Sequence, residues 1–153
     1  MKLSEALINR SDANKHLVQL RSRLQRSSRV QEGDEPPENP EELLQELDRT
    51  LETMTSLIKA INHTNSQTQF DENRTLAEAL ADRDELSTKR GVLQTLIQTA
   101  SVSQQRQTRS EVKFVSTINI QALQKQSDDL AKQYRELDTK IQELNWTTEL
   151  IEK

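Results

Sequence analysis

The sequence predicts an all-α fold: an elongated antiparallel bundle of about four long coiled-coil-like helices, with a short extended or β segment near residues 102–118. Three observations lead to this prediction. Two Gly and three Pro in 153 residues leave little material for the tight turns of a β fold. Apolar residues recur in alternating steps of three and four, as in coiled coils. Hydrophobic residues make up only 32% of the chain and charged residues 30%, so burial must be concentrated in narrow seams. We expect a single helical domain over residues 1–153.

The first helix is expected over about residues 4–30. Its seam consists of Leu3, Ala6, Arg10, Ala13, Leu17, Leu20 and Leu24. Residues 31–40 follow as an acidic loop that contains all three prolines and one of the two glycines. Asn39 is then in position to cap a second helix, because Pro40 suits its first turn.

The second helix, expected over about residues 40–64, has the most regular heptads. Its predicted seam is Leu44, Leu47, Leu51, Met54, Ile58 and Ile61. A seam this regular requires a partner helix, either from the same chain or from another one.

Two further helices are expected over about residues 76–100 and 120–152. Thr75 and Glu78 form a capping box at the start of the first of these, and Asn119 is placed to cap the second. The third helix carries Arg83 and Arg90 among its apolar seam positions. The fourth carries a seam that runs as far as Ile151.

One segment breaks the helical period. Val112, Phe114, Ile118 and Ile120 alternate with more polar residues, and this spacing of two predicts an extended strand. A lone strand exposes unpaired backbone groups, so these four residues are a candidate assembly segment that pairs with a neighbouring strand or a second subunit. A connection packed down on its own helices explains the pattern equally well.

Arg10, Arg83 and Arg90 occupy seam positions where leucine would be more stable. One hypothesis is that each pairs with a carboxylate across a seam and fixes its alignment. The alternative is that these arginines contact a phosphate or carboxylate ligand.

The composition excludes several classes of chemistry. The chain has no Cys, and neither His16 nor His63 follows a Glu at the spacing of a di-iron site, so we expect no metal and no cofactor. No nucleophile–base pair or Gly-rich loop suggests an enzyme. The net charge of −4 argues against nucleic acid as a partner. Without a signal peptide or a long apolar run, the expected location is cytoplasmic, with no membrane association.

The segments MKLSEALINR, VQEGDEPPENPEELLQEL, TLAEALADRDEL and RSEVKFVSTINIQALQKQSDDLAKQYRELDTKIQELNW resemble a group of short bacterial proteins labelled septicolysin. The resemblance covers nearly the whole chain and implies a helical fold. The label also implies a thiol-activated, pore-forming toxin. The sequence departs from such a toxin because it has no Cys and a single tryptophan, Trp146.

Three functions remain open on the sequence alone. The first is a structural or interaction protein that forms a homo-oligomer through its helical seams, because these seams exceed what one chain can bury. The second is a holdase-like chaperone, by analogy with coiled-coil helices that bracket a strand segment. The third is the membrane-active toxin that the resemblance implies.

Overall fold

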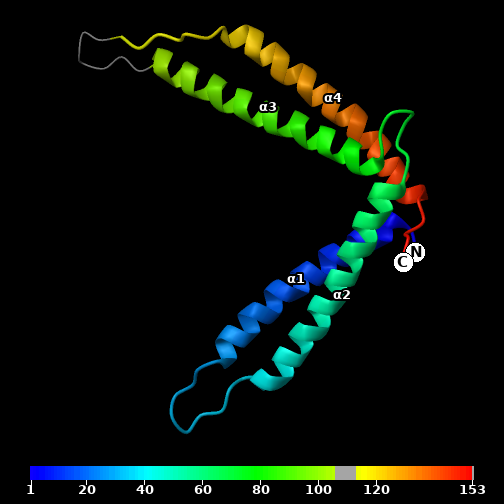
Figure 1. Ribbon diagram of the computed structural model, residues 1–153. Helices are drawn as coiled ribbons and strands as arrows, with labels where there is room; N and C mark the ends of the chain where they lie inside the picture. Colours follow the sequence, from blue (N-terminus) through cyan, green and yellow to red (C-terminus); the bar gives the residue numbers. More distant parts are fainter. Residues whose placement is uncertain (106–112, 153) are drawn as a thin grey trace. The chain divides into compact units, whose positions relative to one another are not determined.

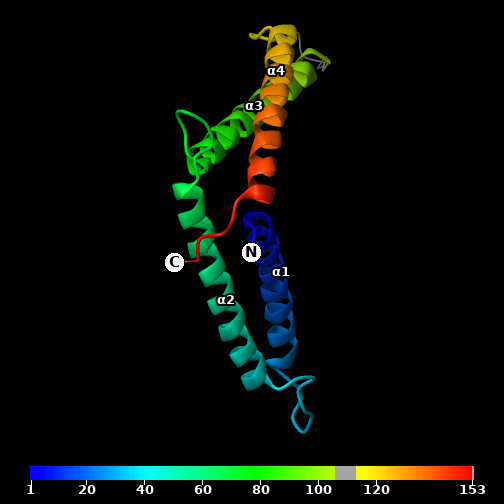
Figure 2. The same cartoon turned by 90° about the vertical axis from the view of Figure 1, so that its right-hand side faces the viewer.

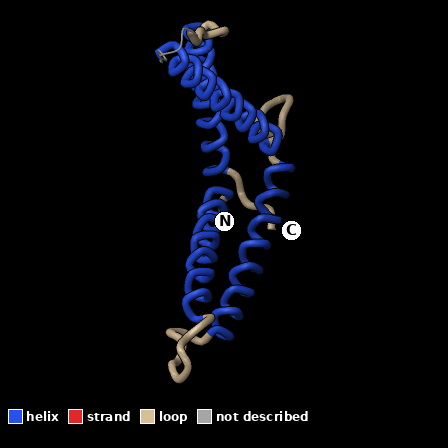
Figure 3. Tube along the Cα trace, turned by 90° about the vertical axis from the view of Figure 1, so that its left-hand side faces the viewer, coloured by secondary structure: helices blue, strands red, loops and turns tan. Residues whose placement is uncertain are grey.

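The structure, a computed structural model, describes residues 1–105 and 113–152. These residues form four long helices and no strand, which confirms the predicted all-α class (Figures 1 and 3). The helices are α1 (Leu3–Ser27), α2 (Pro40–Gln67), α3 (Leu76–Gln105) and α4 (Ile120–Thr147). They belong to two compact units: residues 1–68 with 144–153, and residues 69–143. Each unit is described by itself.

The predicted caps are present at the helix starts. The Asn39 carboxamide oxygen accepts a hydrogen bond from the Glu41 amide at 2.9 Å, and Asn119 accepts one from the Ala122 amide at 3.1 Å. Thr75 and Glu78 form the reciprocal capping box, with bonds of 3.0 and 3.2 Å. Because four amides at each helix start lack intrahelical partners, these side chains determine where the helices begin.

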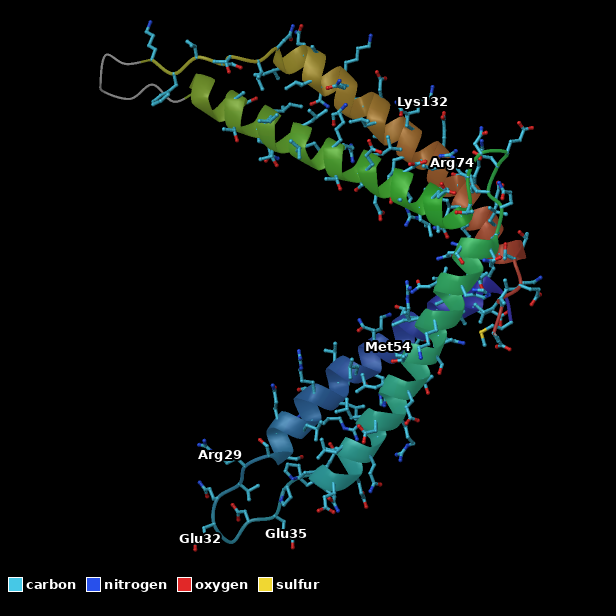
Figure 4. All side chains as sticks on the ribbon, viewed as in Figure 1. Arg29, Glu32, Glu35, Met54, Arg74 and Lys132 are labelled. Carbon is cyan, nitrogen blue, oxygen red and sulfur yellow. The ribbon has the colours of Figure 1, made fainter. Side chains whose placement is uncertain are left out.

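The first unit is an antiparallel hairpin of α1 and α2 (Figure 2). The direction follows from two pairs of side chains: His16 lies 2.9 Å from Glu46, and Arg23 lies 2.6 Å from Glu38. From the first pair to the second, the residue number rises on α1 and falls on the partner segment, so the two segments run in opposite directions. Glu32 and Glu35 lie on the acidic loop that joins the helices (Figure 4).

The two chain ends are fastened together within this unit. The Leu3 amide donates to the Thr148 carbonyl at 2.9 Å, and the Leu150 amide donates to the Met1 carbonyl at 2.9 Å. The Ile151 amide donates to the Thr64 hydroxyl at 2.8 Å. The expected fourth helix over 120–152 is therefore too long, because these backbone groups bond to the N-terminal residues and to α2 instead of continuing the helix.

The second unit is the hairpin of α3 and the part of α4 that ends at Glu143, with helices that lie side by side (Figure 1). Its buried apolar side chains are Leu76, Ala79, Leu93, Ala100, Leu130 and Ile141. Arg83 crosses from α3 to Asp138 on α4 at 2.7 Å. Four of these six residues are large aliphatic residues and two are alanines.

The extended segment predicted near 102–118 requires a correction. Residues 102–105 continue α3, which ends at Gln105, and residues 113–118 contain no strand. Residues 106–112 lie outside the part of the chain that the structure describes. The α3 helix continues because Ser101–Gln105 contains neither Gly nor Pro, the residues that most strongly stop a helix.

Candidate binding surfaces

The seam of α2 is displaced from the predicted one. Leu47, Met54 and Ile61 lie on the buried side as expected, but Leu43 is buried while Leu44 and Leu51 are 49% and 37% exposed. On the surface of α2, positions 43, 50 and 57 lie on one side of the line that joins Leu47, Met54 and Ile61. Positions 44, 51 and 58 lie on the other side of that line. Within the chain, α1 covers the first side more completely. The apolar stripe of α2 is thus wider than one partner helix covers.

Charged side chains occupy one edge of this hairpin. Arg23 donates through Nε and a terminal nitrogen to the two carboxylate oxygens of Glu38, at 2.9 and 2.6 Å. This hydrogen bonding keeps the pKa of Glu38 below its usual range. Glu46 lies 3.9 Å from Arg23 and hydrogen-bonds to His16. We call this the ion-pair edge; it consists of His16, Arg23, Glu38 and Glu46.

The opposite side of the hairpin is apolar and uncovered within the unit. A groove of about 440 Å³ is lined there by Leu17, Val18 and Leu24 of α1 and by Leu47 of α2, with Asn14, Arg21 and Gln25 at its border. Leu44 and Leu51 lie about one turn on either side of Leu47, on the same face of α2. We call this surface the open face; it consists of Leu17, Val18, Leu24, Leu44, Leu47 and Leu51.

The three seam arginines have different surroundings. Arg83 makes the ion pair with Asp138 described above. Arg10 is half-buried on α1, and no carboxylate of the described residues lies within ion-pair distance of it. Arg90 likewise has no ion pair with the described residues, and its buried Nε has no hydrogen-bond partner. The roles proposed for the three residues, alignment or ligand contact, stay predictions.

A cavity of about 340 Å³ opens between α3 and α4 in the second unit. Arg90, Gly91 and Gln94 line it from α3, and Ala131, Tyr134 and Arg135 line it from α4. Sequence reasoning missed Tyr134 and Arg135 as site residues. Tyr134 fits the heptad spacing of the α4 seam, which by itself signals packing, and Arg135 lies next to it at an exposed position of the helix.

Arg74 lies in the loop before α3 (Figure 4) and takes part in a charged network. Asp71 accepts hydrogen bonds from the Arg74 guanidinium at 2.8 and 3.0 Å and from the Asn73 and Arg74 amides, which lowers the pKa of Asp71. Arg74 also pairs with Asp82 at 2.8 Å and lies 5.1 Å from the Phe70 ring centre. These contacts all join neighbouring segments, so the network holds the loop against the start of α3.

The candidate assembly segment is only partly described. Val112 lies outside the described residues. Phe114 is 57% exposed, whereas Ile118 and Ile120 are half-buried. The Ser116 hydroxyl bonds to the Ile118 backbone, which is a local turn contact. An assembly role for these residues stays a prediction.

His16 and His63 do not meet in a metal site. Within residues 1–105 and 113–152, no three histidine or carboxylate side chains gather closely enough to hold a metal ion. In the same ranges, no helix combines the length and apolar character needed to cross a bilayer.

The fold and these surfaces define an all-α protein built from helical hairpins. The chain belongs to the family of unknown function DUF6847, whose model matches residues 10–150. It is also similar to a functionally unknown conserved protein from Corynebacterium diphtheriae, known from a crystal structure. The two share 44% sequence identity over 99% of each chain, with a TM-score of 0.92. No curated protein matches the chain. None of these findings carries the septicolysin label, so that resemblance stays a prediction.

Proposed function

We propose that this protein is an assembly protein that forms a homodimer through the open face of its first hairpin. The observation that carries the proposal is the contrast between the two sides of that hairpin. One side is closed by the ion-pair edge, and the other leaves leucines of a regular heptad stripe in solvent. Burying apolar area releases about 25 cal/mol per Å², so a second helical layer on this face is stabilising.

The charges around the open face support a second copy as the occupant. Arg21 borders the groove on α1 and makes no ion pair with described residues. Glu41 lies at the same level on α2, because Arg21 is five residues beyond His16 and Glu41 is five residues before Glu46. The α1 border of the face is thus basic, from Arg10 and Arg21, and the α2 border is acidic, from Glu41 and Asp48. A surface with one basic and one acidic border complements itself.

This charge pattern also selects the arrangement of the dimer. If the two loops lie at the same end, α1 of one copy packs antiparallel on α2 of the other, and Arg21 meets the partner's Glu41. If the loops lie at opposite ends, α1 packs on α1 and arginine faces arginine. Opposite charges at the borders of a helical interface favour the first arrangement, a four-helix bundle of two hairpins.

Light scattering coupled to size-exclusion chromatography tests the dimer. We expect a mass of twice 17.6 kDa for the unmodified chain and a shift to the single-chain mass for Leu51→Glu, because a carboxylate at this position would be buried in the interface. Gln45→Glu adds the same charge at an exposed position of α2 away from the groove, and it should leave the mass unchanged. A monomeric unmodified chain, or a Leu51→Glu variant that stays dimeric, contradicts the proposal.

A charge exchange tests the arrangement. Arg21→Glu should weaken the dimer, because it places the new carboxylate against the Glu41 carboxylate of the second copy. Glu41→Arg should also weaken the dimer, because it places two guanidiniums against each other. The double variant restores opposite charges and should recover most of the lost affinity. An exposed ion pair contributes about 0.2–1 kcal/mol. The two-fold axis produces two such pairs in each dimer, which doubles the change in affinity. Dimer dissociation constants measured at low salt, where charges are least screened, should resolve this change. A double variant that dimerises as weakly as the single variants would favour the arrangement with loops at opposite ends.

A further inference from the structure

The cavity between α3 and α4 carries an unbalanced positive charge. Arg90 and Arg135 both line it, from opposite helices, and no carboxylate is among its lining residues. Neither arginine forms an ion pair with the described residues. Two guanidiniums that share one cavity repel each other, so an anion between them is stabilised by both.

Arg90 differs from the residue one heptad before it. Arg83 projects from the same face of α3 and meets Asp138 at 2.7 Å. At the level of Arg90, α4 offers no carboxylate and instead presents Ala131, Tyr134 and Arg135. The Nε atoms of Arg83 and Arg90 are both buried without a hydrogen-bond partner, which costs free energy in each case, so the two arginines differ in the ion pair that only Arg83 makes. A seam arginine that served only to align the helices would be expected to have the partner that Arg83 has.

The rest of the lining supplies space and further donors. Gly91 has no side chain, and an added Cβ there would meet nothing within 4 Å. Gln94 of α3 and Tyr134 of α4 also line the cavity, and their side chains carry uncharged hydrogen-bond donors. Arginine forks match both carboxylates and phosphates by paired hydrogen bonds. A carboxylate offers two oxygens, whereas a phosphate group offers three or four and can therefore bond to two guanidiniums and to further donors at the same time.

We infer that this cavity binds a phosphate group, held between Arg90 and Arg135 and hydrogen-bonded by Tyr134 and Gln94. The volume of about 340 Å³ has room for a phosphate together with the small organic group of a phosphate monoester. This site lies entirely within the second unit and does not depend on the proposed dimer.

Nuclear magnetic resonance offers a direct test, because the chain contains one Tyr and one Trp. Carbon-13 labelling of the tyrosine ring reports on Tyr134 in the cavity, and nitrogen-15 labelling of the indole reports on Trp146 in the first unit. Inorganic phosphate and glycerol phosphate should each move the Tyr134 signal saturably at millimolar concentration while the Trp146 signal stays in place. Sodium chloride at matched ionic strength and succinate serve as the anion controls.

Variants separate a built site from general charge attraction. Arg90→Gln and Arg135→Gln should each weaken phosphate binding by about tenfold or more, the loss expected for one charge-assisted hydrogen-bonding group. Arg90→Lys, which keeps the charge but not the fork, should fall between these and the unmodified chain. Lys89→Gln removes the neighbouring charge, which lines a different groove, and should leave the affinity unchanged.

Three results would overturn the inference. The first is a Tyr134 signal that phosphate moves no further than sodium chloride does. The second is that Lys89→Gln weakens phosphate binding as much as Arg90→Gln does, in proteins whose circular dichroism matches that of the unmodified chain. The third is saturation by succinate at lower concentration than by phosphate, which would assign the cavity to carboxylates.

Discussion

The two hairpins place their ion-paired arginines differently. In the first, Arg23 pairs with two glutamates at the edge, and leucines are left over on the open face. The seam position Arg10 of this hairpin is half-buried and makes no ion pair with the described residues. In the second, Arg83 and Arg90 stand in the seam itself, and only Arg83 has a carboxylate partner. The first hairpin therefore has a surplus of apolar surface, and the second has a cavity whose two lining arginines have no carboxylate beside them. The apolar surplus is relieved by another helix, and the repulsion between the two arginines by an anion.

The buried side chains do not differ in the same way. Each hairpin buries four large aliphatic residues: Leu3, Leu20, Leu43 and Ile61 in the first, and Leu76, Leu93, Leu130 and Ile141 in the second. Each also buries small residues, among them Ala6 and Ser27 in the first and Ala79, Ala100 and Ser127 in the second. The contrast between the hairpins therefore lies in the placement of their arginines and not in the bulk of their buried side chains.

The largest expected effect is the loss of a buried leucine in the first hairpin. Leu20→Ala should lower the free energy of unfolding by about 2–5 kcal/mol, because Leu20 is fully buried and its truncation leaves a cavity. Leu44→Ala is the matched control: at protein concentrations too low for assembly it should cost less than about 1 kcal/mol. Urea denaturation measures both. Equal losses at low concentration would mean that the open face is covered within the single chain.

A second prediction compares the two seam arginines. Arg83→Leu should destabilise the protein by about 1 kcal/mol, because it removes an ion pair and leaves the Asp138 carboxylate without this partner. Arg90→Leu, in phosphate-free buffer, should raise the stability by a similar amount, because leucine suits a seam position and no carboxylate loses a partner. Thermal denaturation distinguishes the signs. A loss of stability for Arg90→Leu would indicate a structural role for Arg90 that the free cavity does not explain.

The sequence predicted the helices well because their signals are local. Asn39, Thr75 and Asn119 each cap a helix through atoms within three residues, so the spacing alone identifies them. The end of α4 could not be predicted in this way. Thr148 and Ile151 fit the heptad pattern, but their backbone groups bond to Leu3 and Thr64, which are far away in the sequence.

The candidate surfaces were predicted only in part, and for a physical reason. The apolar stripe of α2 was apparent from its heptads, but the pattern cannot tell which flank a partner helix covers, because Leu43 and Leu44 are equally apolar. Arg83 and Arg90 stood out because charge in a seam is unusual. That Arg83 meets Asp138, whereas Arg90 meets Tyr134 and Arg135, depends on the alignment of α3 against α4, and no local signal specifies that alignment.

The smallest expected effect concerns the loop network of the second unit and its dependence on pH. The Arg74 guanidinium and two backbone amides hold the pKa of Asp71 below its ordinary value of 3.8. A carboxylate whose pKa is lower in the folded state stabilises that state above the unfolded pKa and loses this contribution as the pH falls through the folded pKa. The unmodified protein should therefore have a higher melting temperature than Asp71→Asn at neutral pH, and the difference should shrink below pH 3.8.

Asp71→Asn is a suitable variant because the carboxamide oxygen can still accept from the Asn73 and Arg74 amides, so the loop keeps its turn while the charge is lost. Glu72→Gln removes the neighbouring carboxylate, which makes no ion pair with the described residues, and should leave the melting temperature unchanged at every pH. A melting-temperature difference for Asp71→Asn that stays constant from neutral pH to below 3.8 would show that the loss does not come from the charge. The network would then act through its hydrogen-bond geometry alone.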